Sequence, residues 1–296
     1  MRDLFRAEWL KIAGNRWVAG CLVWIFPLGA LAFLLIAGVV LLLSSAARQG
    51  FRQDEAALWT EQAISVWSFP NNPLGRLILL GFTAVVFAGE YQWGTWKNIV
   101  PRNRRFALVL VKFVALGVFV VLAFALMSVL WAAGWGVLAQ IAGASYGPRV
   151  TAGVIRDFAG DYALAAALAF TSTIIAAGYA ALAGMLTRSI LGGVIVGFAG
   201  TFAESLSIVV LLLIGWLLDI PKAVLAYRFT PGYNLLNVAS WINEKAPSVV
   251  RPYENGAHAG IVLSDSLEFS VLVLATWVAG LILLTGLFFR RQDITS

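Results

Sequence analysis

The densest group of charges in the interior of this chain is the passage EYQWGTWKNIVPRNRRF, residues 90–106, which lies between two long apolar runs. It combines an acid, Glu90, with a Gly94-Thr95 pair, two tryptophans and a cluster of arginines. A carboxylate is stabilised at the N-terminus of a helix by the helix dipole, and tryptophan and arginine favour the surface of a membrane. These residue types predict a short structured element that binds rather than a centre that makes or breaks bonds.

Within this passage Trp93, Trp96 and Ile99 recur at every third position, which predicts an aromatic stripe on a short helix. Pro101 ends that helix, and the basic residues after it anchor the next apolar segment. Such a helix, exposed at the membrane surface, can be gripped by a soluble partner. An ordinary interfacial loop is the alternative, and these residues alone do not decide between the two. The basic anchor residues are Arg102, Arg104 and Arg105.

No set of residues fits a catalytic or metal site. The one histidine, His258, falls in a polar loop, so a Ser-His-Asp arrangement is not available, and the one cysteine, Cys21, cannot form an internal disulfide or a thiolate metal site. The chain also lacks the Gly-x-x-x-x-Gly-Lys-Ser/Thr loop that cradles phosphates. We therefore expect no enzyme activity, metal or cofactor in this chain, and any pumping must draw its energy from a partner or an ion gradient.

Three charged residues fall within apolar segments, where an ionisable side chain is costly and marks a candidate functional site. Lys112 lies about two turns into its segment, so we expect its ammonium group to snorkel to the cytoplasmic surface. Arg76 and Glu204 lie at similar depths in two other segments, which predicts an intramembrane ion pair. In the alternative, Pro73 opens the helix of Arg76 at the outer interface, and Glu204 faces water or the loop outside the membrane.

The composition identifies the environment that these elements need. Of 296 residues, 60% are hydrophobic and 12% are charged, whereas soluble domains carry about 25% charged residues. The apolar runs are continuous rather than alternating, so the chain is an integral membrane protein of helices and not a barrel. The net charge of +6 indicates anchoring against anionic membrane lipids rather than nucleic-acid binding.

The apolar runs predict an all-α integral membrane protein with six transmembrane helices. The third and fifth runs are longer than a bilayer requires, so those helices tilt or project beyond it. Basic residues are more than twice as dense in the segments on the side of the termini as in the opposite loops. The positive-inside rule therefore predicts a multi-pass protein of the plasma (cytoplasmic) membrane with both termini in the cytoplasm. The predicted spans are about Val18–Ser44, Pro73–Gly89, Ala107–Trp135, Tyr162–Leu186, Ile190–Leu218 and Leu267–Phe289.

Two further segments complete the single transmembrane domain that we expect over residues 1–296. Residues 1–17 are too charged to span the membrane, and their apolar side chains share one helical face, which predicts an N-terminal interfacial helix. Residues 219–266 contain Pro, Gly and Asn turn formers and lie between the last two spans, where we expect an extracellular cap. The apolar face of the first helix consists of Leu4, Phe5, Trp9 and Ile12.

The passage FAGEYQWGTWKNIVPRNRRFALVLVKF resembles the stretch after the second span in permease subunits of type-two ATP-binding-cassette (ABC) exporters. The start LFRAEWLKIAGNRW and the end GLFFRRQDI resemble the same family's first and last segments. The resemblance covers the whole chain by its six-span layout and by these three short motifs. The residues that carry the central motif are Glu90, Gly94, Thr95, Arg102, Arg104, Arg105 and Lys112.

The resemblance implies that residues 90–105 contain a coupling helix, which a groove in a separate ATPase subunit would hold. It also implies two ATPase chains that bind ATP and Mg²⁺, a second permease copy or paralogue, and a cargo path lined by the second and fifth spans. An apolar lining suits a lipid-like, peptide or amphiphilic drug cargo, exported by alternating access. The residues that the resemblance assigns to the ATPase contact are Glu90, Tyr91, Trp93, Gly94, Thr95, Trp96 and Lys97.

Other functions remain open on the sequence. A secondary transporter or channel working alone would carry more paired charges or broken helices near the midplane, which are sparse here. A membrane-embedded enzyme would need a polar catalytic cluster. A non-transporting immunity or scaffold protein would have the same composition, and only an assay separates it from a permease.

Overall fold

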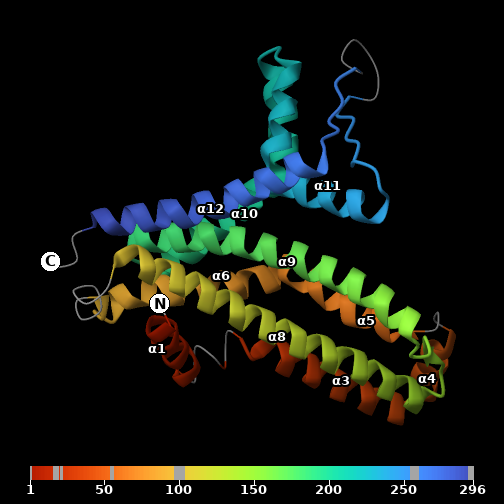
Figure 1. The fold of residues 1–296 in the computed structure, drawn as a ribbon. Coiled ribbons are helices and arrows are strands. Elements are labelled where there is room, and N and C mark those ends of the chain that lie inside the picture. Colours follow the sequence, from red (N-terminus) through yellow and green to blue (C-terminus); the bar gives the residue numbers. More distant parts are fainter. Residues whose placement is uncertain are drawn as a thin grey trace. The chain divides into compact units, whose positions relative to one another are not determined.

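The computed structural model describes residues 2–15, 20, 23–53, 57–96, 104–253 and 260–292. Within these ranges six helices are long and apolar enough to cross a membrane, which confirms the predicted all-α membrane fold. They are α3 (Ile25–Leu43), α6 (Pro73–Gln92), α8 (Arg105–Ala142), α9 (Ala152–Thr187), α10 (Ile190–Leu217) and α12 (Leu267–Arg291) (Figure 1).

Two of these spans are much longer than a bilayer needs. α8 has 38 residues and α9 has 36, so at a rise of 1.5 Å per residue each is about 55 Å long, against a hydrocarbon core of about 30 Å. α9 begins at Ala152 rather than at the predicted Tyr162, because the exposed charges Arg156, Asp157 and Asp161 end the apolar run without ending the helix.

The remaining elements are short. The helices are α1 (Arg2–Gly14), α4 (Ser45–Gln53), α5 (Trp59–Ser65), η1 (Val66–Asn71), η3 (Pro221–Phe229) and α11 (Pro231–Asn243). The two-residue strands β1 (Ala57–Leu58) and β2 (Tyr146–Gly147) pair in parallel. The predicted N-terminal helix is thus present as α1, while its place on the membrane surface stays a prediction.

The chain divides into two compact units, each assembled from segments that are distant in sequence. Unit 1 consists of Met1–Phe82 and Val111–Phe170, and unit 2 consists of Thr83–Leu110 and Thr171–Ser296. The helices α6, α8 and α9 are each divided between the two units.

In unit 1, α3 packs along the C-terminal half of α8 (Figure 1). Leu34 and Leu41 of α3 form one buried cluster with Leu138 and Ala142 of α8. The ring of Phe51 on α4 lies 5.4 Å from that of Trp135, so the short helix after α3 covers the end of the same contact.

Aromatic contacts attach the connecting segments of unit 1 to α9. The Trp59 ring lies 4.8 Å from Phe158, and the Trp67 ring lies 5.8 Å from Tyr162. The indole nitrogen of Trp59 also donates to the carbonyl oxygen of Pro148 at 2.9 Å. The segment between α3 and α6 therefore rests on α9 and on the loop before it.

In unit 2, α9 and α10 approach closely because small residues face each other. A Cβ atom added to Gly197 would lie 2.9 Å from the Cβ of Ala180, and one added to Gly193 would lie 3.0 Å from the Ala180 carbonyl oxygen. Close approach through small residues is a main source of helix association in lipid, where no hydrophobic force draws helices together.

We predict that Gly197→Ala lowers the stability of the purified protein in detergent by about 1–3 kcal/mol, because the added methyl group overpacks the contact with Ala180. Thermal unfolding measures the effect. Gly280→Ala on α12 is the matched control, since a Cβ there meets no atom within 4 Å. Equal melting temperatures for both variants would contradict the close packing of α9 and α10.

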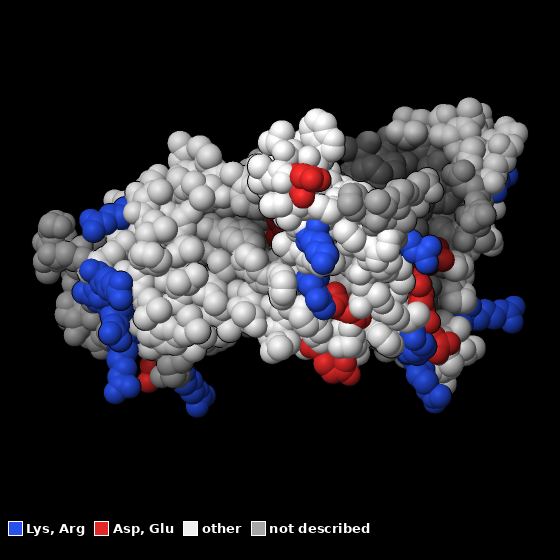
Figure 2. Space-filling view, turned by 90° about the horizontal axis from the view of Figure 1, so that it is seen from above, with Lys and Arg blue, Asp and Glu red and all other residues white. Residues whose placement is uncertain are grey.

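The surface of the spans is largely apolar. Phe202, Leu213 and Trp216 on α10 are all exposed, and of the most apolar stretch of α10 only 6% is buried. Uncharged residues form most of the face in Figure 2, and Lys and Arg gather in groups. Such a surface would drive association in water, whereas lipid covers it without cost.

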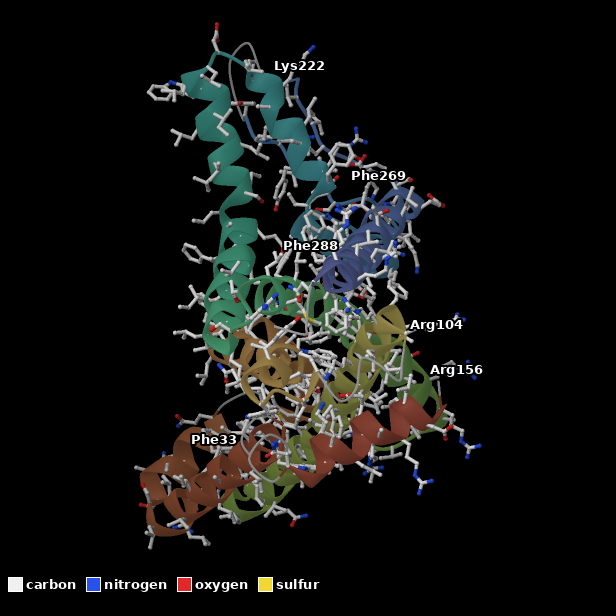
Figure 3. The ribbon with its side chains drawn as sticks, turned by 90° about the vertical axis from the view of Figure 1, so that its left-hand side faces the viewer. Phe33, Arg104, Arg156, Lys222, Phe269 and Phe288 are labelled. Carbon is white, nitrogen blue, oxygen red and sulfur yellow. The ribbon has the colours of Figure 1, made fainter. Side chains whose placement is uncertain are left out.

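The segment predicted as a cap folds back onto its flanking spans. Figure 3 shows the chain leaving the end of α10 near Lys222 and returning beside it as η3. α11 then packs against α12. On which side of the membrane this segment lies stays a prediction.

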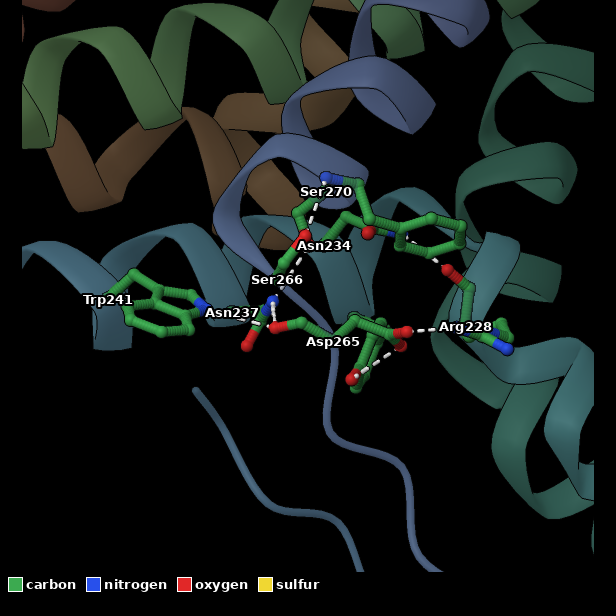
Figure 4. Close-up of polar contacts among 9 residues, drawn as sticks. Arg228, Asn234, Asn237, Trp241, Asp265, Ser266 and Ser270 are labelled. Atoms are coloured by element: carbon green, nitrogen blue, oxygen red, sulfur yellow. Dashed lines mark hydrogen bonds and ion pairs between the residues drawn. The ribbon is translucent and has the colours of Figure 1, made fainter. Parts of the chain in front are cut away.

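Asp265, just before α12, is the centre of a polar network in this segment (Figure 4). Its carboxylate accepts from the hydroxyl of Tyr233 at 3.0 Å and pairs with Arg228. Its carbonyl oxygen accepts from Asn237 at 3.0 Å and from Trp241 at 2.9 Å. Burial and the Asp265 carboxylate raise the pKa of Tyr233, so the hydroxyl stays a donor. The network fixes η3 and α11 to the start of α12.

Candidate functional site

The structure at the start of residues 90–105 differs from the short helix that was predicted there. Glu90 and Tyr91 belong to the last turn of α6, and the chain then turns at residues 93–95 before it becomes helical again at Trp96. Gly94 has φ +65°, a left-handed conformation that glycine adopts without the penalty of a Cβ atom. The prediction of one helix starting at residue 90 is therefore wrong at its start.

This turn separates the two tryptophans that were expected on one stripe. Trp96 is 1% exposed, and its ring lies 4.4 Å from that of Phe289 on α12. Trp93 is 52% exposed, with its ring next to Gly89. Ile99 lies outside the described residues. One tryptophan thus anchors the turn and the other lies open on its surface.

Glu90 stabilises the turn through hydrogen bonds with Thr95. It is fully buried, and its carboxylate accepts from the Thr95 hydroxyl. The Thr95 amide also donates to the Glu90 carbonyl oxygen at 3.1 Å. An ionised carboxylate away from water is costly unless it is hydrogen-bonded. Glu90 therefore does not cap the start of a helix, as was predicted. It lies in the last turn of α6 and accepts a hydrogen bond from Thr95, the residue before the chain becomes helical again.

Arg105, one of the predicted anchor residues, binds the end of α12. From the first position of α8, its Nη1 atom donates to the carbonyl oxygens of Phe289 (3.1 Å), Arg290 (3.0 Å) and Gln292 (2.6 Å). The last carbonyls of a helix lack the usual intrahelical partners, although the Phe289 carbonyl also accepts from the Gln292 amide at 3.4 Å, and the helix dipole favours a cation at this end. Arg104 is exposed and projects outward (Figure 3). Arg102 and Lys97 lie outside the described residues.

Tyr91 connects the same region to α9. Its hydroxyl contacts the sulfur of Met185 at 3.3 Å and the amide oxygen of Gln292. The Gln292 amide nitrogen in turn donates to the Met185 carbonyl oxygen at 2.6 Å. The guanidinium of Arg188 lies 5.9 Å from the centre of the Tyr91 ring.

These contacts gather the ends of α6, α8, α9 and α12 around the buried Trp96. We call the set the turn cluster. Sequence reasoning did not give Met185, Arg188 or Gln292 a role, because a contact between chain ends leaves no local pattern. The turn cluster consists of Glu90, Tyr91, Thr95, Trp96, Arg105, Met185, Arg188, Phe289 and Gln292.

The predicted pair of Arg76 and Glu204 has other neighbours in the two units. Arg76 donates to the side-chain oxygen of Asn71. Glu204 accepts a hydrogen bond from Tyr179 and lies near the start of α11, where a Cβ on Gly232 would be 3.6 Å from its Oε1 atom. An ion pair between Arg76 and Glu204 stays a prediction.

Lys112 does not snorkel to the surface as expected. It is fully buried in unit 1, and its Nζ atom lies 3.1 Å from Oε2 of Glu8 on α1. The Trp9 ring stacks on Phe119 of α8 at 4.3 Å. The partners Glu8 and Lys112 are 104 positions apart. The signal that could have found the pair is Glu8 itself, an acid among the apolar residues of one helical face.

A second lysine shares this carboxylate. The Nζ atom of Lys11 lies 3.6 Å from Oε1 of Glu8. Burial, and next the ammonium of Lys112, lower the pKa of Lys11 to about 7, against the opposing effect of Glu8. Near neutral pH, Lys11 is therefore only partly protonated, which reduces the positive charge beside the ion pair.

The fold and these clusters define a polytopic membrane protein whose spans are bound together at their ends. The sequence model described as "ABC-2 family transporter protein" matches residues 4–204. The chain belongs to this family and is a permease subunit of an ABC transporter, a class that works with ATPase subunits. No curated protein matches the chain, and no solved structure matches it.

We predict that Trp96→Ala destabilises the protein by about 3–5 kcal/mol, because it removes a fully buried ring from the centre of the turn cluster. Trp93→Ala, three positions away, changes stability by less than about 0.5 kcal/mol, since Trp93 lies on the surface. Thermal unfolding in detergent compares the two. Similar losses for both would mean that Trp93 is also packed.

Thr95 offers a narrower test of the turn. Thr95→Val keeps the shape of the side chain but removes the hydroxyl that binds Glu90, which leaves a buried carboxylate short of a donor and costs about 1–3 kcal/mol. Thr95→Ser keeps the hydroxyl and is expected to behave as the parent protein. If the valine and serine variants unfold at the same temperature, the hydrogen bond to Glu90 does not stabilise the turn.

Proposed function

We propose that this chain is the permease subunit of an ATP-driven exporter, which moves an amphiphilic cargo by alternating access. In the working complex it pairs with a second copy or a paralogue and with two ATPase subunits, which bind ATP and Mg²⁺. The chain itself hydrolyses no ATP. Both termini and the end of α6 lie in the cytoplasm, where the ATPase subunits can reach them.

The observation that carries this proposal is the turn cluster. A soluble motor can move a bundle of helices only if the surface that it grips is firmly attached to them. Trp93 and Gly94 lie on the outside of the turn. On its inside, Trp96, Glu90 and Arg105 bind α6, α8 and α12 together, and Tyr91 adds the contact to α9. A force on the exposed side is therefore passed to the ends of α6, α8, α9 and α12 together.

The surface of α10 supports an amphiphilic cargo. Exposed apolar side chains run along the helix from Leu191 to Leu217, and Thr201, Glu204 and Ser207 place polar groups among them. A path lined by such a helix would take a lipid-like molecule, a peptide or an amphiphilic drug in preference to a small ion.

The experiment isolates the tagged protein from a mild detergent extract of its native membrane and measures ATP hydrolysis in the eluate. We expect hydrolysis to copurify with the parent protein. Trp93→Ala should reduce it severalfold, because tryptophan is a frequent energetic anchor of protein interfaces.

Trp216→Ala is the matched control. Trp216 is also an exposed tryptophan, in the last turn of α10, and its replacement should not affect the copurifying activity. Absence of hydrolysis with the parent protein would contradict an ATPase partner. Equal activity in the Trp93 and Trp216 variants would show that the ATPase binds elsewhere.

A further inference from the structure

The ion pair between Glu8 and Lys112 is deeply buried within unit 1. The exposed fraction of the side chain is 6% for Glu8 and 1% for Lys112. Such a pair is weak evidence for stability, because removing two charges from water offsets much of their attraction. Its geometry, however, permits one arrangement of the two helices and penalises others.

Aromatic contacts continue from this pair to a third helix. Trp9 on α1 stacks on Phe119 of α8, with ring planes 16° apart. Phe119 in turn meets the edge of Phe82 on α6, at a centroid distance of 6.4 Å. Phe119 and Phe82 are both buried, and all three residues belong to unit 1. Helix α1 is therefore connected to α6 through the Phe119 ring of α8.

α6 is the helix that ends at the turn cluster. It runs without interruption from Pro73 past Phe82 to Gln92. A pull on the turn moves α6 as a rod only if the helix beside it holds its position. If α8 could slide or rotate against α1, the side chains around Phe119 would repack. Part of the displacement of α6 would then not reach its far end.

We propose that Glu8 and Lys112 are positioning residues for transport, which brace α8 against α1 so that displacement of the turn cluster is transmitted along α6. This inference rests on the proposed function. It adds a requirement that lies outside the ATPase contact: the brace determines how far the far end of α6 moves per ATP-driven step, not whether ATP is hydrolysed.

The test follows the far end of α6 by chemical labelling. Cys21→Ser removes the one native cysteine, and Leu74→Cys places a thiol at an exposed position in the first turn of α6. The complex with its ATPase subunits is reconstituted in liposomes. The labelling rate with a membrane-impermeant maleimide is measured without nucleotide and with ATP and vanadate.

We expect nucleotide to change the labelling rate in this parent protein. Glu8→Gln should reduce that change to less than half while ATP hydrolysis continues. The charge-reversed pair Glu8→Lys/Lys112→Glu should restore it. Asp3→Asn, which removes an exposed carboxylate from the same helix, is the matched control and should leave the change intact.

A full nucleotide-dependent change in Glu8→Gln would overturn the brace and leave the proposed function standing. No nucleotide effect in the parent protein would remove the proposed function, and this inference with it. If Glu8→Gln does not accumulate in the membrane, Trp9→Leu takes its place: it keeps the ion pair but removes the stack on Phe119. A full change in that variant would also overturn the brace.

Discussion

The hydrocarbon core of a bilayer offers no hydrogen-bond partner, so each polar group in this chain must reach water or find its partner in the protein. Where partners are found, distant segments are joined. Glu8 reaches Lys112 across 104 positions, Arg105 reaches the last carbonyls of α12, and Asp265 joins η3 and α11 to the start of α12. Elsewhere the spans touch mainly through small or apolar side chains, as Gly197 and Ala180 do. The polar contacts therefore join helix ends that are distant in the sequence.

This division between polar contacts at helix ends and apolar contacts elsewhere suits a transporter that is driven from one side of the membrane. The close contact of α9 and α10 is made largely by small residues and includes the hydrogen bond from Tyr179 to Glu204, whereas the turn cluster cannot deform without exposing Glu90 or the carbonyls that Arg105 binds. A permease needs both properties. In the proposed mechanism, the helix ends joined by the turn cluster receive the force, and the apolar faces allow the helices to move relative to one another in lipid.

The sequence predicted what depends on local pattern. Each span was found because a long apolar run is sufficient to make a membrane helix, and the importance of residues 90–105 followed from charges placed between two such runs. The errors have equally physical causes. Gly94 breaks the expected helix through a backbone conformation that no periodicity reveals. The prediction that Lys112 reaches the surface failed because tertiary packing alone brings its partner, Glu8, to it. Sequence analysis gave Asp265 no role, because its donors lie on η3 and α11, 24 to 37 positions earlier.

The turn cluster and the pair of Glu8 and Lys112 have different energetic roles. In the turn cluster, breaking the contacts would remove the Thr95 donor from a buried carboxylate and the Arg105 donor from the terminal carbonyls of α12, so the cluster resists opening. At Glu8 and Lys112, the cost of burying both charges nearly cancels their attraction, so the pair adds little to stability but strongly disfavours a change of register, which would separate the charges. A helix that is gripped firmly at one end and guided at constant register along its length can only be displaced as a whole. In the mechanism that we propose, that combination would let a soluble ATPase at the membrane surface move groups at the far side of a bilayer about 30 Å thick.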